Sequence, residues 1–403
     1  MVAMTRVAPA DPGAALANKR RRLAGVDAAR GVALIGMFSV HLFRMDYGPD
    51  APLARELASG RSAALFAVLA GVGIALATGG AQPWRGRSLQ RARRAVAARA
   101  AVVAAIGLTL AVTDATILII LPYYAALFLL AIPVLGWPAR RLAVLAAVAA
   151  VITPVVSHLL RQGADVAIEG NPTWSDLLTG PVQAAGVLLL TGTYPVLTWS
   201  TYLFAGLAIG RLALGRPRVA GQLVLAGAGL ALAGWAVGWV TLALVGRPTV
   251  ASALPRGGVP EAYLDSMSLH WFFGTPPTTQ WWWLGIRAPH IGTTPDLVHT
   301  TGTALVVLGV CLLMAPRVGR WARPLVAAGS MTLTLYTVHV LAFRGLSLVA
   351  EDAPRVAALP ATSVWLAHVG VALVVATAWG SPARRGPLES LSALAARRAA
   401  GAR

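Results

Sequence analysis

The sequence is dominated by apolar stretches that are long enough, or nearly long enough, to cross a lipid bilayer. A helix needs about 20 apolar residues to span the hydrocarbon core, and ten such stretches follow one another along the 403 residues. With 57% hydrophobic and only 12% charged residues, the chain is far too apolar for a soluble protein of this length. The sequence therefore predicts an all-α, polytopic transmembrane helix bundle.

The ten predicted spans are separated by short polar turns. The third is short, and we expect it to borrow residues from the arginine-rich turn before it. Residues 177–190 are also apolar, but Gly180, Pro181 and Gln183 leave open whether they span or lie at the interface. The spans cover residues 23–45, 61–78, 100–112, 115–135, from the turn at 137–141 to 158, 194–209, 219–245, 297–315, 325–349 and 361–379.

Lysine and arginine are distributed unevenly between alternate connections. Cytoplasmic loops collect these residues, and only nine of the 34 fall in the connections assigned to the outer side. Six arginines lie in the turn at 84–99 alone. We therefore expect both termini in the cytoplasm and the chain in the cytoplasmic (inner) membrane. The net charge of +19 then reflects topology and not a nucleic-acid partner.

The longest polar insert, residues 246–296, is assigned to the outer side. It is rich in Pro, Gly and aromatic residues, with Trp271 and a run of three tryptophans at 281–283. Long irregular segments in compact proteins are usually functional or disordered. The tryptophans fit an aromatic belt at the membrane surface or, alternatively, a lid or sugar-stacking platform.

The first span carries charged residues that are costly inside a membrane. Intramembrane ionisable groups mark functional sites by default, and this span contains Asp27, Arg30 and His41. At 100° and 1.5 Å per residue, Arg30 and His41 share a helix face about 16 Å apart. Asp27 lies one turn before Arg30 and is placed to pair with it. We predict a structural Asp27–Arg30 pair near the cytoplasmic surface and a catalytic imidazole at His41.

Several stretches resemble the bacterial relatives of heparan-α-glucosaminide N-acetyltransferase, within the transmembrane acyltransferase superfamily. The spacing of Arg30 and His41 is also similar to the R-x10-H signature of the acyltransferase-3 branch. The resembling stretches are VDAARGVALIGMFSVH, SGRSAALFAVLAG, ILPYYAALFLLAIP, TGTYPVLTWSTYLFAGLAIGR and PHIGTTPDLVHTTG. The resemblance makes residues 23–380 an acyltransferase-like domain between two basic tails, 1–22 and 381–403. It implies transfer of an acetyl or other acyl group from cytoplasmic acyl-CoA to a sugar or glycan.

The chain departs from the lysosomal heparan enzyme at one important place. That enzyme has asparagine at the position of His41 and a catalytic histidine in the following loop, whereas residues 42–60 here contain no histidine. The base role therefore passes to His41, and heparan is not carried over as the acceptor. A cell-envelope glycan, glycolipid or secreted sugar is the expected acceptor, through a hydroxyl or an amine.

Acetyl-CoA, as the implied donor, needs cations for its phosphates and hydrogen-bond donors near its thioester. Guanidinium matches phosphate geometry, and Tyr123 and Tyr124 are expected to bind the donor, where they, Thr334 or Tyr336 could stabilise the carbonyl as it becomes negative. The predicted donor-binding arginines are Arg30, Arg85, Arg87, Arg91, Arg94 and Arg211.

The remaining histidines are weaker candidates. His339 shares a helix face with Thr332 and Tyr336, which should turn inward, and His290 and His299 flank the outer mouth of the eighth span. We predict His339 and His290 as alternative catalytic residues, and His158, His270 and His368 as interfacial. No two histidines are spaced i, i+4 and the single cysteine, Cys311, is isolated, so no metal site or disulfide is predicted.

Two other classes of function stay open at this point. A transporter or flippase for a lipid-linked or small sugar would use the same intramembrane polar face, although no inverted repeat of the Arg30–His41 arrangement is present. A noncatalytic membrane assembly protein would leave both residues dispensable. The partners implied are lipid, acyl-CoA and a sugar acceptor, and a homo-oligomer is left open.

Overall fold

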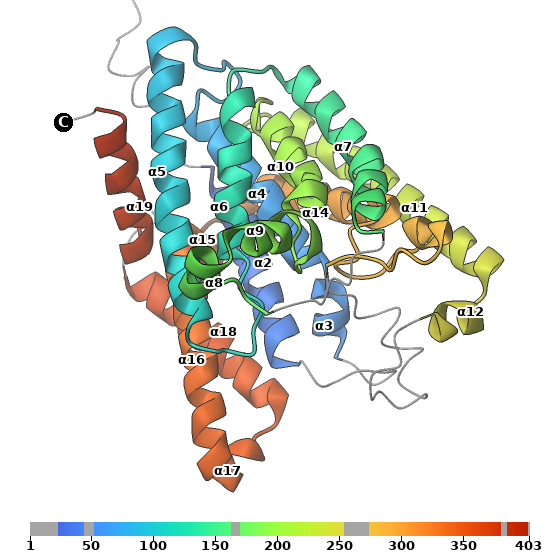
Figure 1. Cartoon of the computed structure of the whole chain (residues 1–403). Coiled ribbons are helices and arrows are strands. Elements are labelled where there is room, and N and C mark those ends of the chain that lie inside the picture. Colours follow the sequence, from blue (N-terminus) through green and yellow to red (C-terminus); the bar gives the residue numbers. More distant parts are fainter. Residues whose placement is uncertain (1–22, 44–51, 163–169, 254–273, 380–384, 402–403) are drawn as a thin grey trace, which may run out of the picture.

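The computed structural model describes residues 23–43, 52–162, 170–253, 274–379 and 385–401, and these residues form an all-helical bundle (Figure 1). Eight helical segments within them are long and apolar enough to cross a membrane. The predicted class of fold, a polytopic helix bundle, is confirmed. The tail at 1–22, His270 and Trp271 lie outside the described residues.

Each predicted span corresponds to helix in the structure, and shorter helices fill several of the connections. The helices of the bundle are α2 (Ala24–Leu42), α4 (Arg61–Ala77), α5 (Gly86–Ala111), α6 (Leu121–Ala131), α7 (Ala139–Leu160), α10 (Val196–Gly210), α11 (Pro217–Val245), α14 (Thr294–Val318), α15 (Arg323–Ser330), α16 (Thr332–Asp352) and α18 (Ala361–Ala378). The shorter ones are α3 (Leu53–Ala58), α8 (Trp174–Thr179), α9 (Pro181–Gly186), α12 (Arg247–Ser252) and α17 (Pro354–Ala357), and a further helix, α19 (Pro387–Ala399), follows α18.

Two predicted spans are shorter than a membrane crossing. The helix at Leu121–Val134 and α10 are apolar, but neither reaches 18 residues. In α10 every residue from Thr198 to Gly210, and Val196 before them, is buried. A helix surrounded by other helices does not have to match the thickness of the lipid, and α10 packs against α4 and α7. Helix α10 therefore lies within the bundle, where neighbouring helices cover it, whereas the helix at Leu121–Val134 leaves Leu129 and Leu130 exposed.

Three sequence predictions are corrected by the helix boundaries. The predicted turn at 84–99 is mostly the first half of α5, so the third span does borrow from it. The predicted span at 325–349 is broken at Met331 into α15 and α16. The predicted basic tail at 381–403 contains α19, which packs along α5 and is seen beside it at the left of Figure 1.

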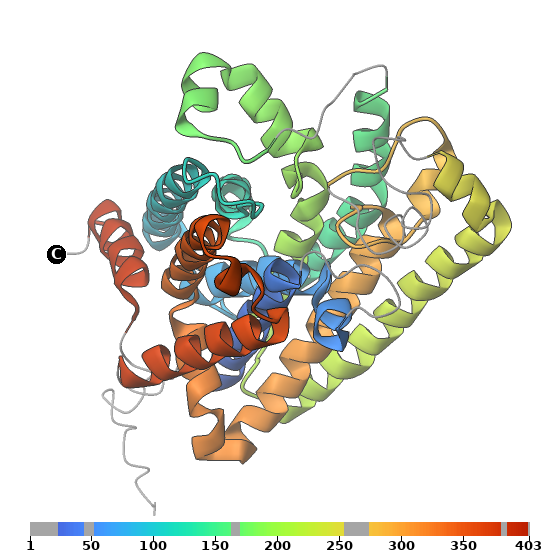
Figure 2. The same ribbon diagram turned by 90° about the horizontal axis from the view of Figure 1, so that it is seen from below.

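The apolar segment at 177–190 forms α8, α9 and a π-helical turn at Val187–Thr191. Neither α8 nor α9 exceeds six residues, which is too short to span a bilayer. In Figure 2, α8 and α9 lie at the edge of the bundle, away from α2 and α14. This segment is therefore peripheral and does not add a span.

The helix break at Met331 lies where α15 packs closely on α2. A Cβ atom added at Gly329 would come within 1.6 Å of the backbone oxygen of Asp27 and 2.9 Å of the nitrogen of Gly31. Small residues allow membrane helices to approach through their backbones, and Gly329 permits that approach here. The contact brings the end of α15, and hence the start of α16, against the segment of α2 that contains Asp27 and Arg30.

We expect Gly329→Ala to destabilise the protein, because the obstructing atoms are backbone and cannot rotate away. Overpacking of this kind costs about 1–3 kcal/mol, measured as a lower thermal unfolding midpoint of the detergent-purified protein. Gly345→Ala is the control, since no atom lies within 4 Å of a Cβ at this α16 position. Equal midpoints for the two variants would show that α15 does not rest on α2 in this way.

Candidate functional site

Two of the predicted histidines meet inside the bundle. Nδ1 of His41, in α2, lies 3.1 Å from Nε2 of His339, in α16. The two rings are stacked, with centroids 5.3 Å apart and planes at 11°. His41 lies in the last turn of α2, where the helix dipole favours a positive charge, and His339 is only 2% exposed. The contact joins positions 298 residues apart in the chain.

The His339 ring also contacts Phe38 and His368. Phe38 stacks on the His339 ring at 4.1 Å, and His368, on α18, meets it edge-on at 5.3 Å. Nδ1 of His368 lies 2.9 Å from the carbonyl of Val364, so this nitrogen carries the proton. The prediction that His368 is interfacial is wrong: its ring points toward the histidine pair.

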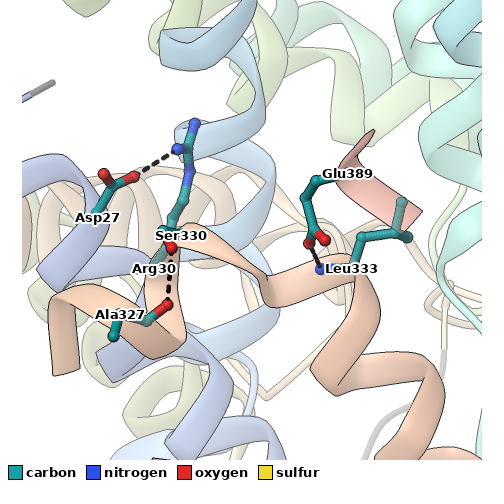
Figure 3. Close-up of polar contacts among 6 residues, drawn as sticks. All are labelled: Asp27, Arg30, Ala327, Ser330, Leu333 and Glu389. Carbon is teal, nitrogen blue, oxygen red and sulfur yellow. Dashed lines mark hydrogen bonds and ion pairs between the residues drawn. The ribbon is translucent and has the colours of Figure 1, made fainter. Parts of the chain in front are cut away.

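Asp27 and Arg30 form the predicted ion pair. Nη1 of Arg30 donates to Oδ1 of Asp27 at 2.9 Å (Figure 3). Asp27 is buried, whereas about a quarter of the Arg30 side chain (28%) is exposed. The guanidinium lies against α4, where a Cβ at Gly73 would come within 2.6 Å of it. The pairing compensates the cost of a buried carboxylate and leaves part of the guanidinium accessible.

The α5 arginines remain exposed near the helix start. Arg85, Arg87, Arg91 and Arg94 are all exposed, and the last three are spaced i, i+4, i+7, so they share one face. Arg99, three turns into α5, has Arg30 among its charged neighbours. A row of cations therefore leads from the start of α5 toward the Asp27–Arg30 pair.

Arg211 has a structural role. It is 4% exposed, and its Nη1 donates to the carbonyls of Ala75, Thr78 and Gly80 at 2.8, 3.3 and 3.0 Å. Its Nη2 donates to the Thr78 hydroxyl and the Leu135 carbonyl. These contacts join the turns that follow α4, α6 and α10. We do not carry Arg211 forward as a phosphate ligand.

Replacing Arg211 should therefore affect folding before it affects substrate binding. Lysine keeps the charge but cannot reproduce the planar fork of donors, and hydrogen bonds to charged groups are worth about 1.5–3 kcal/mol each. We expect Arg211→Lys to lower the unfolding midpoint clearly in a thermal scan. Arg218→Lys, at an exposed position in the first turn of α11, should leave the midpoint unchanged. A stable Arg211→Lys protein would contradict the structural role.

The predicted tyrosines are buried but differ in their contacts. The Tyr124 hydroxyl donates to the carbonyl of Ala63 at 3.3 Å, and Tyr123 meets Tyr194 edge-to-face at 5.5 Å. Tyr336 is 3% exposed and faces inward with His339, as the α16 pattern predicts. Thr334 is different: its hydroxyl binds Glu389 of α19, which removes it from the candidates for stabilising a carbonyl.

His290 and His299 contact a different set of residues, around Tyr194 and the start of α4. His290 meets Tyr194 at 5.8 Å between ring centroids, and His299 binds Arg61 and the carbonyl of Ala231. Burial lowers the pKa of His290 to about 4, which makes it a weak base. It also has a φ of +63°, a strained conformation for a residue other than glycine. The structure therefore favours His339 over His290 as the partner of His41.

The tryptophan run is only partly exposed. Trp283 is fully buried with Val250, Ile286 and Ile291, whereas Trp281 is 53% exposed and covers His158 at a ring distance of 4.5 Å. His158 is itself completely buried and lies in the last turn of α7. Trp283 is a core residue. Trp281 keeps an exposed ring surface, which suits an aromatic belt or a stacking platform.

A small cavity of about 160 Å³ lies at the start of α2. Asp27 and Arg323 line it together with apolar and small residues of α2, α14, α15 and the turn between α14 and α15. It is too small for a nucleotide, so it does not define a coenzyme site by itself. Among the described residues no group of three or more His, Cys, Asp or Glu is arranged to hold a metal ion.

The described helices and this site define a multi-pass membrane protein with polar and titratable groups gathered inside the bundle. A family model described as heparan-alpha-glucosaminide N-acetyltransferase, catalytic, matches residues 22–238. The chain therefore belongs to this family of membrane acetyltransferases, whose donor is acetyl-CoA. No curated protein matches the chain. The matched residues include Asp27, Arg30 and His41, whereas His339 and Glu389 lie beyond them.

Proposed function

We propose that the protein transfers an acetyl group from cytoplasmic acetyl-CoA to a hydroxyl or amine of a sugar or glycan on the outer side of the cytoplasmic membrane, with His41 as general base. The observation that supports this best is the 3.1 Å contact between His41 Nδ1 and His339 Nε2. General bases need a tuned and oriented imidazole, and a second, buried imidazole provides that orientation.

The direction of this hydrogen bond decides which nitrogen is basic. When Nδ1–H of His41 donates to Nε2 of His339, Nε2 of His41 carries the lone pair and can accept a proton. Once protonated, the His41 ring keeps its bond to His339 and lies in the last turn of α2, where the helix dipole stabilises the cation. His339 thus plays the part that an orienting carboxylate plays in hydrolase triads, without adding a negative charge.

The transfer step then balances as follows. His41 Nε2 takes the proton of the acceptor hydroxyl or amine as its oxygen or nitrogen bonds to the thioester carbon. The carbon–sulfur bond breaks, and the departing thiolate recovers the proton from His41. Tyr123 and Tyr336 are the hydroxyl-bearing residues proposed to stabilise the carbonyl while it is negative. Tyr124 is left out because its hydroxyl already donates to the carbonyl of Ala63.

The donor is proposed to bind along α5 with its thioester directed outward. Arg85, Arg87, Arg91 and Arg94 are exposed near the helix start, where the helix dipole also favours anions. Arg30 lies further along the same path, paired with Asp27. Because His41 lies about 16 Å beyond Arg30 by helix rise, the pantetheine arm has to pass between the helices to reach it.

We expect His41→Asn to lower kcat for acetyl transfer roughly 10²–10⁴-fold, the usual contribution of general-base catalysis, with little change in KM for acetyl-CoA. His339→Asn should lower kcat less, since the base remains. Transfer from radiolabelled acetyl-CoA to glucosamine or to methyl glucoside, which lacks an amine, measures both variants and separates N- from O-transfer.

Ser39→Ala is the control for the histidine variants. Its hydroxyl donates only to the carbonyl of Ile35 within α2, so activity should stay near that of the wild type. If His41→Asn were as active as Ser39→Ala, the base would lie elsewhere.

We expect the combined change of Arg87, Arg91 and Arg94 to Gln to raise KM for acetyl-CoA roughly tenfold or more, because charged hydrogen bonds to phosphate are lost. Acetyl-pantetheine, which lacks the nucleotide phosphates, should be used equally well by the variant and the wild type. Arg140→Gln, at the exposed second residue of α7, should leave KM unchanged for both acetyl-CoA and acetyl-pantetheine. An equal loss with both donors would place the phosphates elsewhere.

A further inference from the structure

The start of α16 is capped by a residue of α19, in the C-terminal tail. Met331 precedes α16 and gives no side-chain cap, although a helix start leaves its first N–H groups without partners. Glu389, in α19, supplies the acceptors: its Oε1 receives the N–H of Leu333 at 2.6 Å and of Thr334 at 3.2 Å, as Figure 3 shows for Leu333. Its Oε2 receives the Thr334 hydroxyl at 2.6 Å.

The arrangement is reciprocal. Leu388 N–H, in the first turn of α19, donates to the Thr334 hydroxyl oxygen at 3.1 Å. The third residue of each helix, Thr334 in one and Glu389 in the other, therefore caps the opposite helix. In an ordinary capping box both partners belong to one helix. Two helix starts placed together carry like partial charges, and the Glu389 carboxylate between them offsets that repulsion.

Few other residues of α16 are held in place by burial in the protein. Of its 21 residues only Leu335, Tyr336, His339 and Val340 are buried. His339 lies about one and a half turns after Thr334 and meets His41 through one polar contact. A shift at the start of α16 therefore moves the His339 ring, and misplacement of about 1 Å can cost 10²-fold in rate.

We infer that α19 is a clamp, with Glu389 as a positioning residue that holds α16 so that His339 meets His41. This inference rests on the proposed function for its effect on catalysis, but not for its effect on structure. Glu389 does not touch the reacting atoms. It acts through the backbone of Leu333 and Thr334 and through the Thr334 hydroxyl.

The test compares Glu389→Gln with Asp176→Asn in the full-length protein. Asp176 caps the exposed start of α8 through Thr173, so it is a matched carboxylate-to-amide change at another helix start. In Glu389→Gln we expect faster amide hydrogen exchange at residues 332–336 and several-fold faster modification of His339 by diethylpyrocarbonate, followed by mass spectrometry. Asp176→Asn should leave both rates unchanged. Equal rates in the two variants would overturn the clamp.

Activity supplies the second measurement. Glu389→Gln should lower kcat for acetyl-CoA roughly 10²-fold with KM unchanged, and Thr334→Val should behave alike, whereas Thr334→Ser keeps the hydroxyl and should restore the wild-type values. A fall in kcat with His339 still protected would overturn the positioning role. A wild-type protein that leaves acetyl-CoA unused would contradict the proposed function, and the exchange and modification rates would still decide the clamp.

Discussion

Polar groups that the chain carries into the bilayer have to find partners within the protein, because lipid offers none. This constraint accounts for the contacts that organise the bundle. Arg211 joins three turns through carbonyls and a hydroxyl, and Asp27 pairs with Arg30. The start of α16 draws its acceptors from α19. Asp27 and Arg30 pair within α2, whereas the contacts of Arg211 and Glu389 link elements that are distant in sequence.

The same constraint explains how much of the fold the sequence could predict. Apolar length and arginine distribution locate the helices, since both follow directly from the bilayer. They do not reveal the break at Met331. Methionine is apolar, so the mean hydropathy of the segment stays high at the point where the helix is interrupted. The helix in the C-terminal tail does have local signals, with Pro387 at its first position, Glu389 in its first turn and two arginines in its last. These are start and stop signals for a helix, but the surrounding positive charge suggested only a solvated tail.

The candidate site was predictable only in its local parts. Spacing along one helix is sufficient to place Asp27 beside Arg30 and to put His41 on the same face. The inward direction of Tyr336 and His339 likewise follows from the α16 pattern. The contact between His41 and His339 depends on how α2 and α16 cross, which no spacing encodes. For His368 and Arg211 the surroundings decide the role: one faces a histidine pair, and the other is enclosed by carbonyls.

The depth of the α16 start explains why a charged residue from the tail is needed there. Helix α2 extends about 16 Å from Arg30 to His41 by helix rise, whereas His339 is only five positions, or about 8 Å, after Thr334. For the imidazoles to meet, α16 has to begin nearer to them than α2 does. The first residues of α16 are half-buried, their N–H groups have no acceptor within the helix, and the preceding residue, Met331, gives no side-chain cap. A carboxylate brought by a second helix satisfies several donors at once, and it ties the height of His339 to the position of α19.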